Sequence, residues 1–350
     1  MTAGESRLAL DRVAGDGSAN LLLSSATALC SPLCIASGRV PLTIAWLEGA
    51  GFEVRWVRSL QLQRAQIDGL WESLIPTISQ RRVDVATASL TAGPAALLGL
   101  RRPAVDASAT SHLLALKGSA DPLARGEGTL RSRLGAPNIL TSLIHTPDTS
   151  EDLLRELQLL LPRTDELEKF WHAMHTGGTR DNSLPLDLSG DDPPPPITAL
   201  IVGLRLRARL LARFADGASA TFASTIGEIS SAVDRDLEVA QQSDPTDPLT
   251  ALARYRATFE PQRDRLLRAV AADVTTAGLD ESRRLACAGY AQLESMAAGE
   301  PFDLEVLTAR LSGAGVVPNT WERVVLASEW ATPSPQLRGR ELAQRTNSPD

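Results

Sequence analysis

The chain has 350 residues, of which 43% are hydrophobic and 22% charged, a composition typical of folded proteins. This length predicts two domains. The net charge of −7 offers no general attraction for phosphate backbones, so we expect no nucleic-acid partner. The 35 basic residues include only two lysines, Lys117 and Lys169, so a site that needs an ammonium group has two candidates.

Three cysteines in a chain of this length do not indicate a disulfide framework. The first twenty residues are polar and acidic, unlike a signal peptide. The longest apolar runs, near Leu21 and Ile197, are interrupted by Ser, Gly or Arg and are too short for a membrane span. We therefore expect a soluble, cytoplasmic protein with no membrane partner.

The N-terminal half mixes the two-residue period of strands with the helical period. It predicts strands over 21–25, 53–57 and 139–144. It also predicts helices over 41–49, 63–74 and 149–161, with a helix end or a strand at 111–116. Thr149 or Ser150 is the expected cap of the helix over 149–161, whose first turn is acidic.

Two expectations concern side-chain faces. In the helix over 41–49, one side carries Leu42, Ala45, Trp46 and Gly49. In the strand over 53–57, Val54 and Trp56 alternate with Glu53 and Arg55.

A Gly-, Asp- and Pro-rich segment over 176–196 ends in four consecutive prolines, which no helix or strand continues through, so we expect a linker there. After it, 197–214, 218–241, 248–275, 281–298, 303–312 and 320–330 carry helical spacing. We expect a helical domain of unknown role over 197–331 and a disordered tail over 332–350.

The most specific motifs lie between residues 118 and 156. Gly118-Ser119-Ala120-Asp121-Pro122 is followed by Gly128-Thr129-Leu130-Arg131, by His145-Thr146-Pro147-Asp148, and by a helix that carries Glu156. In order and spacing this run resembles the nucleoside diphosphate kinase family, and the resemblance covers about residues 20–165.

The resemblance implies an α+β domain, a ferredoxin-like antiparallel sheet covered by helices, joined to the C-terminal all-α domain. It also implies phosphotransfer from a nucleoside triphosphate to a diphosphate through a phosphohistidine at His145, with Mg²⁺ on the nucleotide phosphates. Glu156 would orient the imidazole, and Arg131 would bind nucleotide phosphates. Arg101 and Arg102, in a preceding loop, are further candidates for phosphate binding.

The sequence departs from the family pattern at several phosphate-binding positions. Cys30 falls where the family has its phosphate-binding lysine, and Leu114 falls where it has a second arginine. By sequence, neither lysine of the chain is placed to replace the missing one. The loss of such donors lowers transition-state stabilisation and predicts weak turnover.

Two other functions therefore stay open. One is a catalytically reduced protein that binds nucleotide, or nothing, and serves as an interaction scaffold, with a second copy or a protein partner on the helical domain. The other is a phosphohistidine relay to a protein, which needs His145 but less of the phosphate site.

Three further features have simpler explanations than a site. Cys30 and Cys34 lack metal-ligand spacing and are expected in the core. His172 and His175 are spaced to chelate a metal, but they lie near a helix C-terminus, which favours cationic side chains. The arginines at 205, 207, 209 and 213 are expected on a solvated helix face, or paired with acids around Glu238.

Overall fold

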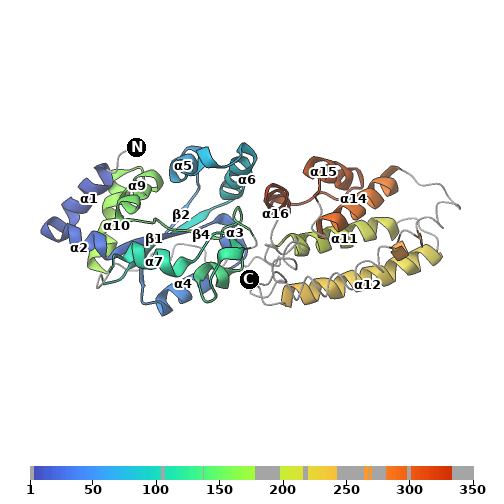
Figure 1. Cartoon of the computed structure of the whole chain (residues 1–350), viewed down its shortest axis with the longest axis horizontal. Coiled ribbons are helices and arrows are strands. Elements are labelled where there is room, and N and C mark those ends of the chain that lie inside the picture. The colour runs from blue at the N-terminus through green and yellow to red at the C-terminus, as the bar shows by residue number, and fades with distance from the viewer. Residues whose placement is uncertain are drawn as a thin grey trace, which may run out of the picture. The chain divides into compact units, whose positions relative to one another are not determined.

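The protein is described here by a computed structural model. It describes residues 4–103, 107–136, 138–177, 198–215, 220–242, 264–266, 268–269, 281–297 and 301–332. The chain divides into two compact units, Met1–Pro195 (unit 1) and Pro196–Asp350 (unit 2), each described by itself (Figure 1). Two expected segments lie outside the described residues. They are the linker after Gly177 and the tail after Thr332.

Unit 1 is built on a four-stranded antiparallel sheet with the order β2-β3-β1-β4. The strands are β1 (Ser25–Cys30), β2 (Glu53–Leu60), β3 (Ala95–Arg101) and β4 (Ile144–His145). Each neighbouring pair is antiparallel, so β1 and β2 run in the same direction with β3 between them. This is the ferredoxin-like arrangement, and the predicted α+β fold is confirmed.

Two predicted strands were placed wrongly. The strand expected over 21–25 begins only at Ser25, because residues 18–23 form helix α2 (Ser18–Leu23). The Ser25 hydroxyl donates to the Leu21 carbonyl at 2.7 Å and occupies an acceptor at the end of this helix.

The strand expected over 139–144 shrinks to its last residue and His145. The Asn138 side-chain oxygen accepts hydrogen bonds from the backbone of Leu140 and Thr141, both at 3.0 Å. This local turn competes with strand pairing and uses backbone donors that a sheet would need.

A register shift between Val54 and Trp56 breaks the alternation expected in β2. As a result Val54 and Val57 are the buried residues, and Trp56 is only partly buried. A bulge of this kind adds one residue to one strand and re-aims the side chains that follow it.

The helices of unit 1 surround the sheet or extend it (Figure 1). Besides α2 they are α1 (Gly4–Ala14), α3 (Pro32–Ala36), α4 (Val40–Gly49), α5 (Arg64–Leu70), α6 (Gln80–Thr91), α7 (Ala109–Lys117), α8 (Leu130–Leu134), α9 (Ser150–Leu160) and α10 (Thr164–Thr176). Short 3₁₀ turns cover Gly15–Gly17, Ile75–Thr77 and Pro122–Ala124. Unit 1 extends beyond the expected 20–165, because α1 packs on α9 and α10.

Two helices differ from their predicted form. The helix expected over 63–74 ends at Leu70 and is followed by turns. In α4 the buried residues are Val40, Thr43, Ile44 and Leu47, whereas the side named from the sequence is the outer one and Leu42 is 41% exposed. Apolar residues occur on every side of α4, so periodicity alone does not select its buried face.

The core of unit 1 lies where α1, α9 and α10 meet β1 and β3. The Trp56 and Phe170 rings meet edge to face with centroids 5.3 Å apart. A Cβ on Gly99 of β3 would come within 2.9 Å of Phe170, so this close approach needs glycine. The buried Trp171 donates its indole N–H to the Ser6 carbonyl at 3.2 Å.

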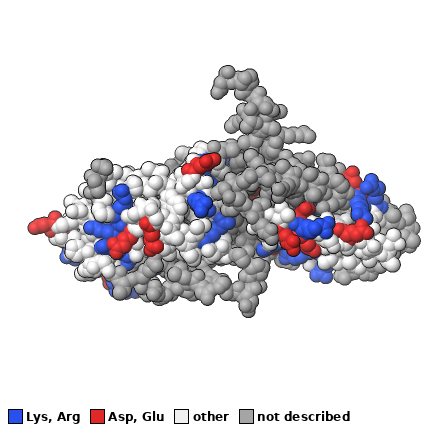
Figure 2. Space-filling view, turned by 90° about the horizontal axis from the view of Figure 1, so that it is seen from below, with Lys and Arg blue, Asp and Glu red and all other residues white. Residues whose placement is uncertain are grey.

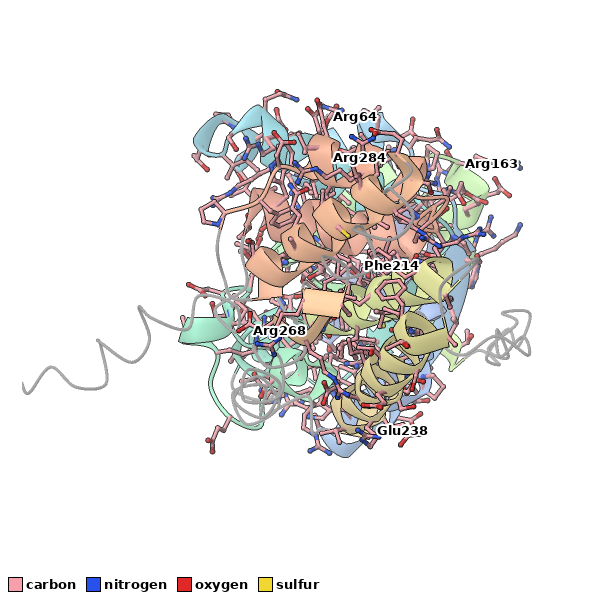
Figure 3. All side chains as sticks on the ribbon, turned by 90° about the vertical axis from the view of Figure 1, so that its right-hand side faces the viewer. Arg64, Arg163, Phe214, Glu238, Arg268 and Arg284 are labelled. Carbon is pink, nitrogen blue, oxygen red and sulfur yellow. The ribbon has the colours of Figure 1, made fainter. Side chains whose placement is uncertain are left out.

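The described part of unit 2 is helical, as predicted. Its helices are α11 (Ala199–Ala215), α12 (Ala220–Gln242), α14 (Glu281–Ala297), α15 (Leu304–Gly313) and α16 (Thr320–Ala331). Phe214 of α11 points into the interior of the unit, where its ring meets that of Phe222, whereas Glu238 lies at the edge (Figure 3). Most of the helix expected over 248–275 lies outside the described residues.

The arginines of α11 fit the expected solvated face only in part, because Arg213 is exposed whereas Arg207 is not. Arg207 is fully buried, donates to the Tyr290 hydroxyl and lies over that ring. Arg209 pairs with Glu322 at 2.5 Å, and not with Glu238. On the face shown in Figure 2, basic and acidic side chains lie intermingled.

Candidate active site around His145

His145 ends the edge strand β4, where it pairs with Leu29 of β1. Its Nε2 lies 2.9 Å from Oε2 of Glu156. The Glu156 side chain is 5% exposed and that of His145 is 28% exposed, so the carboxylate is buried behind an accessible ring. In the described part of the chain, Nδ1 of His145 has no hydrogen-bond partner, which leaves one ring nitrogen available for chemistry.

Helix α9 brings Glu156 to the histidine. Thr149 caps it by accepting from the backbone N–H of Asp152 at 3.0 Å, so the expectation of Thr149 as cap is confirmed. Four leucines at helical spacing, Leu153, Leu154, Leu157 and Leu160, bury one face in the core. This anchoring fixes the direction in which Glu156 projects.

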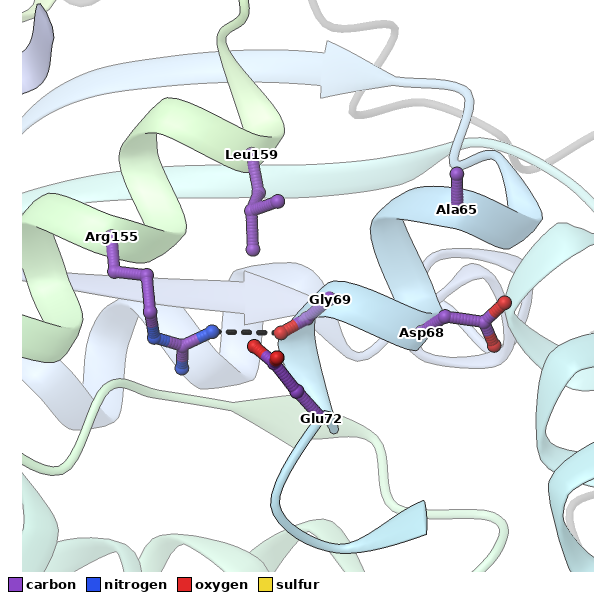
Figure 4. Close-up of a pocket in the computed structure, with 6 residues that line it drawn as sticks. All are labelled: Ala65, Asp68, Gly69, Glu72, Arg155 and Leu159. Atoms are coloured by element: carbon purple, nitrogen blue, oxygen red, sulfur yellow. Dashed lines mark hydrogen bonds between the residues drawn. The ribbon is translucent and has the colours of Figure 1, made fainter. Parts of the chain in front are cut away.

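Arg155 links the Glu156 carboxylate to α5. Its Nη2 lies 3.6 Å from Oε1 of Glu156, and its Nη1 donates to the Gly69 carbonyl at 2.7 Å. Figure 4 shows this bond beside a cavity of about 280 Å³, whose lining is completed by Ala65, Asp68, Glu72 and Leu159. Arg155 therefore supports the carboxylate from the side away from the ring.

Lys117 contacts the residue that follows His145, which the sequence did not indicate. It ends α7, is 5% exposed, and its Nζ lies 3.4 Å from the Thr146 carbonyl and 3.3 Å from Oδ1 of Asp148. Burial, and next the charge of Arg131, lower the pKa of Lys117, while Asp148 and Glu156 oppose that shift. An ammonium group therefore stands next to the residue that follows the histidine.

Arg131 also contacts a residue next to the histidine, but its terminal nitrogens already have partners. Nη1 donates to the Gly118 carbonyl at 3.0 Å and Nη2 to the Ile144 carbonyl at 3.2 Å. The residue is 9% exposed, and burial lowers its pKa to about 10. Arg131 thus holds β4 and the loop after α7 together, and its positive charge lies beside the strand that carries His145.

Arg125, which sequence reasoning missed, fixes the loop between α7 and α8. Its guanidinium donates to the carbonyls of Ser119, Ala120 and Ala136 at 3.2, 2.9 and 2.8 Å. Because every residue type offers a backbone carbonyl, contacts of this kind leave no motif in a sequence.

Gly118, at the start of the same loop, has to be glycine. Its φ is +80°, and a Cβ there would come within 2.4 Å of the Thr129 hydroxyl. The close approach lets Arg131, two residues after Thr129, reach the Gly118 carbonyl.

Arg101 and Arg102 do not join this cluster. Arg101 pairs with Ser25 at the far end of β1, whereas His145 pairs with Leu29. Four residues of strand separate these positions, about 13 Å along β1. The Arg102 backbone N–H donates to the Ser24 carbonyl at 2.9 Å. The geometry therefore does not support the expectation that these arginines bind phosphates next to His145.

The position that corresponds to the family lysine faces the interior. Cys30 and Cys34 are both fully buried, and Sγ of Cys34 lies 3.9 Å from the Thr43 hydroxyl. The hydrogen bond with Cys34 and burial raise the pKa of Cys30, which remains a thiol. The expectation of two core cysteines is confirmed.

His172 and His175 lie on α10, which ends at Gly177 as expected. Across the described residues, no group of three His, Cys, Asp or Glu side chains is arranged to hold a metal ion. The helices that the structure describes also include none that is long and apolar enough to cross a bilayer.

No family model matches the sequence, and no curated protein matches it. Among solved structures, the chain is similar to a nucleoside diphosphate kinase from Pyrobaculum aerophilum, with 16% identity over 41% of this chain and 98% of that one and a TM-score of 0.33. It is similar to the enzyme from Aquifex aeolicus, with 12% identity over 39% and 94% and a TM-score of 0.34. A third similar structure is that of a nucleoside diphosphate kinase from Encephalitozoon cuniculi, with 18% identity over 40% of this chain and 90% of that one and a TM-score of 0.34.

At these identities and TM-scores the likeness carries no conclusion about activity. Part of this chain is similar to nucleoside diphosphate kinases, as the motifs between residues 118 and 156 predict.

Proposed function

We propose that unit 1 transfers the γ-phosphoryl group of a nucleoside triphosphate through a phosphohistidine at His145. The observation that carries this proposal is the pairing of an accessible imidazole with a buried carboxylate. Glu156 accepts from Nε2 of the ring at 2.9 Å, and this places the lone pair of the neutral imidazole on Nδ1. Nδ1 is then the nucleophile.

In the first half-reaction Nδ1 attacks the γ-phosphorus, the bond from phosphorus to the bridging oxygen breaks, and the diphosphate leaves with its electrons. The ring keeps the proton on Nε2 and becomes cationic, and the Glu156 carboxylate balances this charge. In the second half-reaction a terminal oxygen of an acceptor diphosphate attacks the same phosphorus, and the N–P bond returns its electrons to Nδ1. No proton has to leave the ring in either step.

Mg²⁺ fits this proposal as an ion carried by the nucleotide. The described residues offer no three-ligand cluster for a resident metal, and Mg²⁺ commonly binds through substrate phosphates, waters and one or two carboxylates. The carboxylate of Asp148, three residues after His145, is 63% exposed and is the one that such an ion would meet. The ion would neutralise charge on the phosphates.

A catalytically reduced protein that acts as a nucleotide-binding or interaction scaffold is the second candidate. Two observations favour it: Cys30 is a buried thiol, and both terminal nitrogens of Arg131 donate to backbone carbonyls. In that case unit 2 would carry the binding surface for a second copy or another protein.

Incubation of the full chain with γ-labelled ATP and Mg²⁺ separates the two candidates. We expect an acid-labile, base-stable label that is absent from His145→Ala and unchanged in His172→Ala, which alters an exposed histidine of α10. Label that persists in His145→Ala contradicts phosphotransfer through this residue, and a wild-type protein without label supports the scaffold.

A further inference from the structure

We propose that the Lys117 ammonium group binds the phosphoryl group while it is transferred to and from His145. This inference rests on the proposed phosphotransfer. Charge on the phosphoryl oxygens has to be stabilised in the transition state, and donors aimed at it supply most of the stabilisation. The described cations that reach residues next to His145 are Lys117 and Arg131.

Of these two cations, Lys117 is held by the longer hydrogen bonds. Both terminal nitrogens of Arg131 donate to carbonyls, as described above. An ammonium group has three N–H donors, and the two contacts of Lys117, to Thr146 and Asp148, are long at 3.4 and 3.3 Å. One donor therefore remains, and the two in use are weakly bound.

The partner of Lys117 is one that a phosphate group can displace. The carboxylate of Asp148 is 63% exposed, whereas the side chain of Lys117 is 6% exposed. Asp148 can turn into water at little cost, because an exposed carboxylate is well solvated there. A phosphoryl group that arrives at His145 carries two negative charges. It can therefore replace the single negative charge of the Asp148 carboxylate as the partner of Lys117.

Two residues that interact with Lys117 each carry a buried polar atom without a hydrogen bond among the described residues. The two atoms are the hydroxyl of Thr146, whose carbonyl accepts from Lys117, and Nε of Arg131, whose charge acts on Lys117. Thr146 is 1% exposed and Arg131 9%. Buried atoms of this kind are normally satisfied, so their occurrence together indicates a place that a ligand or water completes.

The burial of Lys117 also sets it apart. Lysine is rarely buried without a specific reason, and the second lysine of the chain, Lys169, is exposed and pairs with Asp165, one turn earlier in α10. A buried ammonium group that contacts the loop after the histidine is therefore expected to serve the site.

Because the chain has two lysines, the contact can be observed in the wild-type protein. Lysine labelled with ¹³C at Cε gives two signals, and Lys169→Met assigns them. We expect the Lys117 signal to shift in a saturable way when the Mg²⁺ complex of a β,γ-imido analogue of ATP is added, and the Lys169 signal to stay. If His145 forms phosphohistidine with ATP but the analogue leaves the Lys117 signal unmoved, the inference is overturned.

A kinetic test uses Lys117→Met with Lys169→Met as the matched control. We expect Lys117→Met to slow phosphohistidine formation about 10²–10³-fold, as for other transition-state donors, with unchanged circular dichroism, and Lys169→Met to react like the wild type. Equal rates in all three proteins overturn the inference but leave the proposed function intact. If the wild type forms no phosphohistidine, the proposed function fails and this inference fails with it.

Discussion

Oε2 of Glu156 lies 2.9 Å from Nε2 of His145, and this contact joins α9 to the edge strand β4. The Glu156 carboxylate is buried and the His145 ring is partly exposed, so solvent reaches the ring and not the carboxylate. A carboxylate in this position fixes which ring nitrogen carries the proton. In the proposed reaction, this carboxylate would also stabilise the positive charge that the ring gains on phosphorylation.

We expect Glu156→Gln to slow phosphohistidine formation about tenfold. The amide oxygen can still accept from Nε2, but a hydrogen bond to a charged partner contributes about 1.4 kcal/mol more than a neutral one, which is about tenfold in rate. Single-turnover labelling with γ-labelled ATP measures this. Glu151→Gln, which changes an exposed acid in the first turn of α9, is the control. A Glu156→Gln protein that is labelled as fast as the wild type would remove Glu156 from the mechanism.

The pH dependence of stability should report on Lys117. Its pKa in the folded protein is below its ordinary value of 10.5, so between these two values the unfolded chain binds more protons. The free energy of unfolding therefore rises with pH across that window.

Lys117→Met cannot titrate at this position and should lack this part of the rise. Denaturant titrations of both proteins from about pH 8 up to the ordinary lysine pKa of 10.5 measure the difference, in which titrating groups away from Lys117 largely cancel. Parallel pH profiles for the two proteins would mean that burial does not penalise the ammonium form.

Cys30→Lys should destabilise unit 1 by at least about 3 kcal/mol, and it should not restore a family-like phosphate site. Cys30 is fully buried beside Cys34, so a lysine there would be an unpaired buried charge. Urea unfolding measures the change, and Cys30→Ala, which adds no charge, should lose much less. A stable and more active Cys30→Lys protein would show that the side chain can turn toward His145.

The resemblance implied that Glu156 contacts His145, and the structure places the two side chains together. The residues alone predicted the cap Thr149 of the helix that carries Glu156. Lys117 could not be predicted, because its reach toward Asp148 depends on how α7 packs in three dimensions. Proximity in the sequence also does not reveal that Arg101 pairs at the end of β1 away from the position paired with His145.

The same limit applied to the fold. The residue periods predicted only a mixed α/β or α+β domain, whereas the ferredoxin-like sheet was implied by the family resemblance and is observed. Most of the strand expected over 139–144 does not form. The side-chain oxygen of Asn138 accepts hydrogen bonds from two backbone N–H groups that a strand would need. The buried face of α4 was missed because its apolar residues occur all round the helix, so that only the packing partners select the face.

In unit 2, Tyr290→Phe should lower stability by about 1.5–3 kcal/mol. The Tyr290 hydroxyl accepts from the guanidinium of the fully buried Arg207, and a buried charged group that loses a hydrogen bond incurs its desolvation cost. Chemical denaturation followed by far-ultraviolet circular dichroism measures the loss. A Tyr290→Phe protein that unfolds at the same denaturant concentration as the wild type contradicts this account.

Unit 1 alone should form phosphohistidine at the rate of the full chain. His145, Glu156, Lys117 and Arg131 all belong to Met1–Pro195, and their contacts described above are made within it. A chain that ends at Pro195 is therefore expected to fold, because unit 1 has its own core around α1, α9 and α10. Labelling with γ-labelled ATP and circular dichroism test both expectations in one preparation.

The contrary outcome is a truncated chain that folds but is labelled more than about tenfold slower, which is a loss of about 1.4 kcal/mol of transition-state stabilisation. Unit 2 would then contribute to the reaction. Its role would then be in catalysis or nucleotide binding and not only in the binding of a partner.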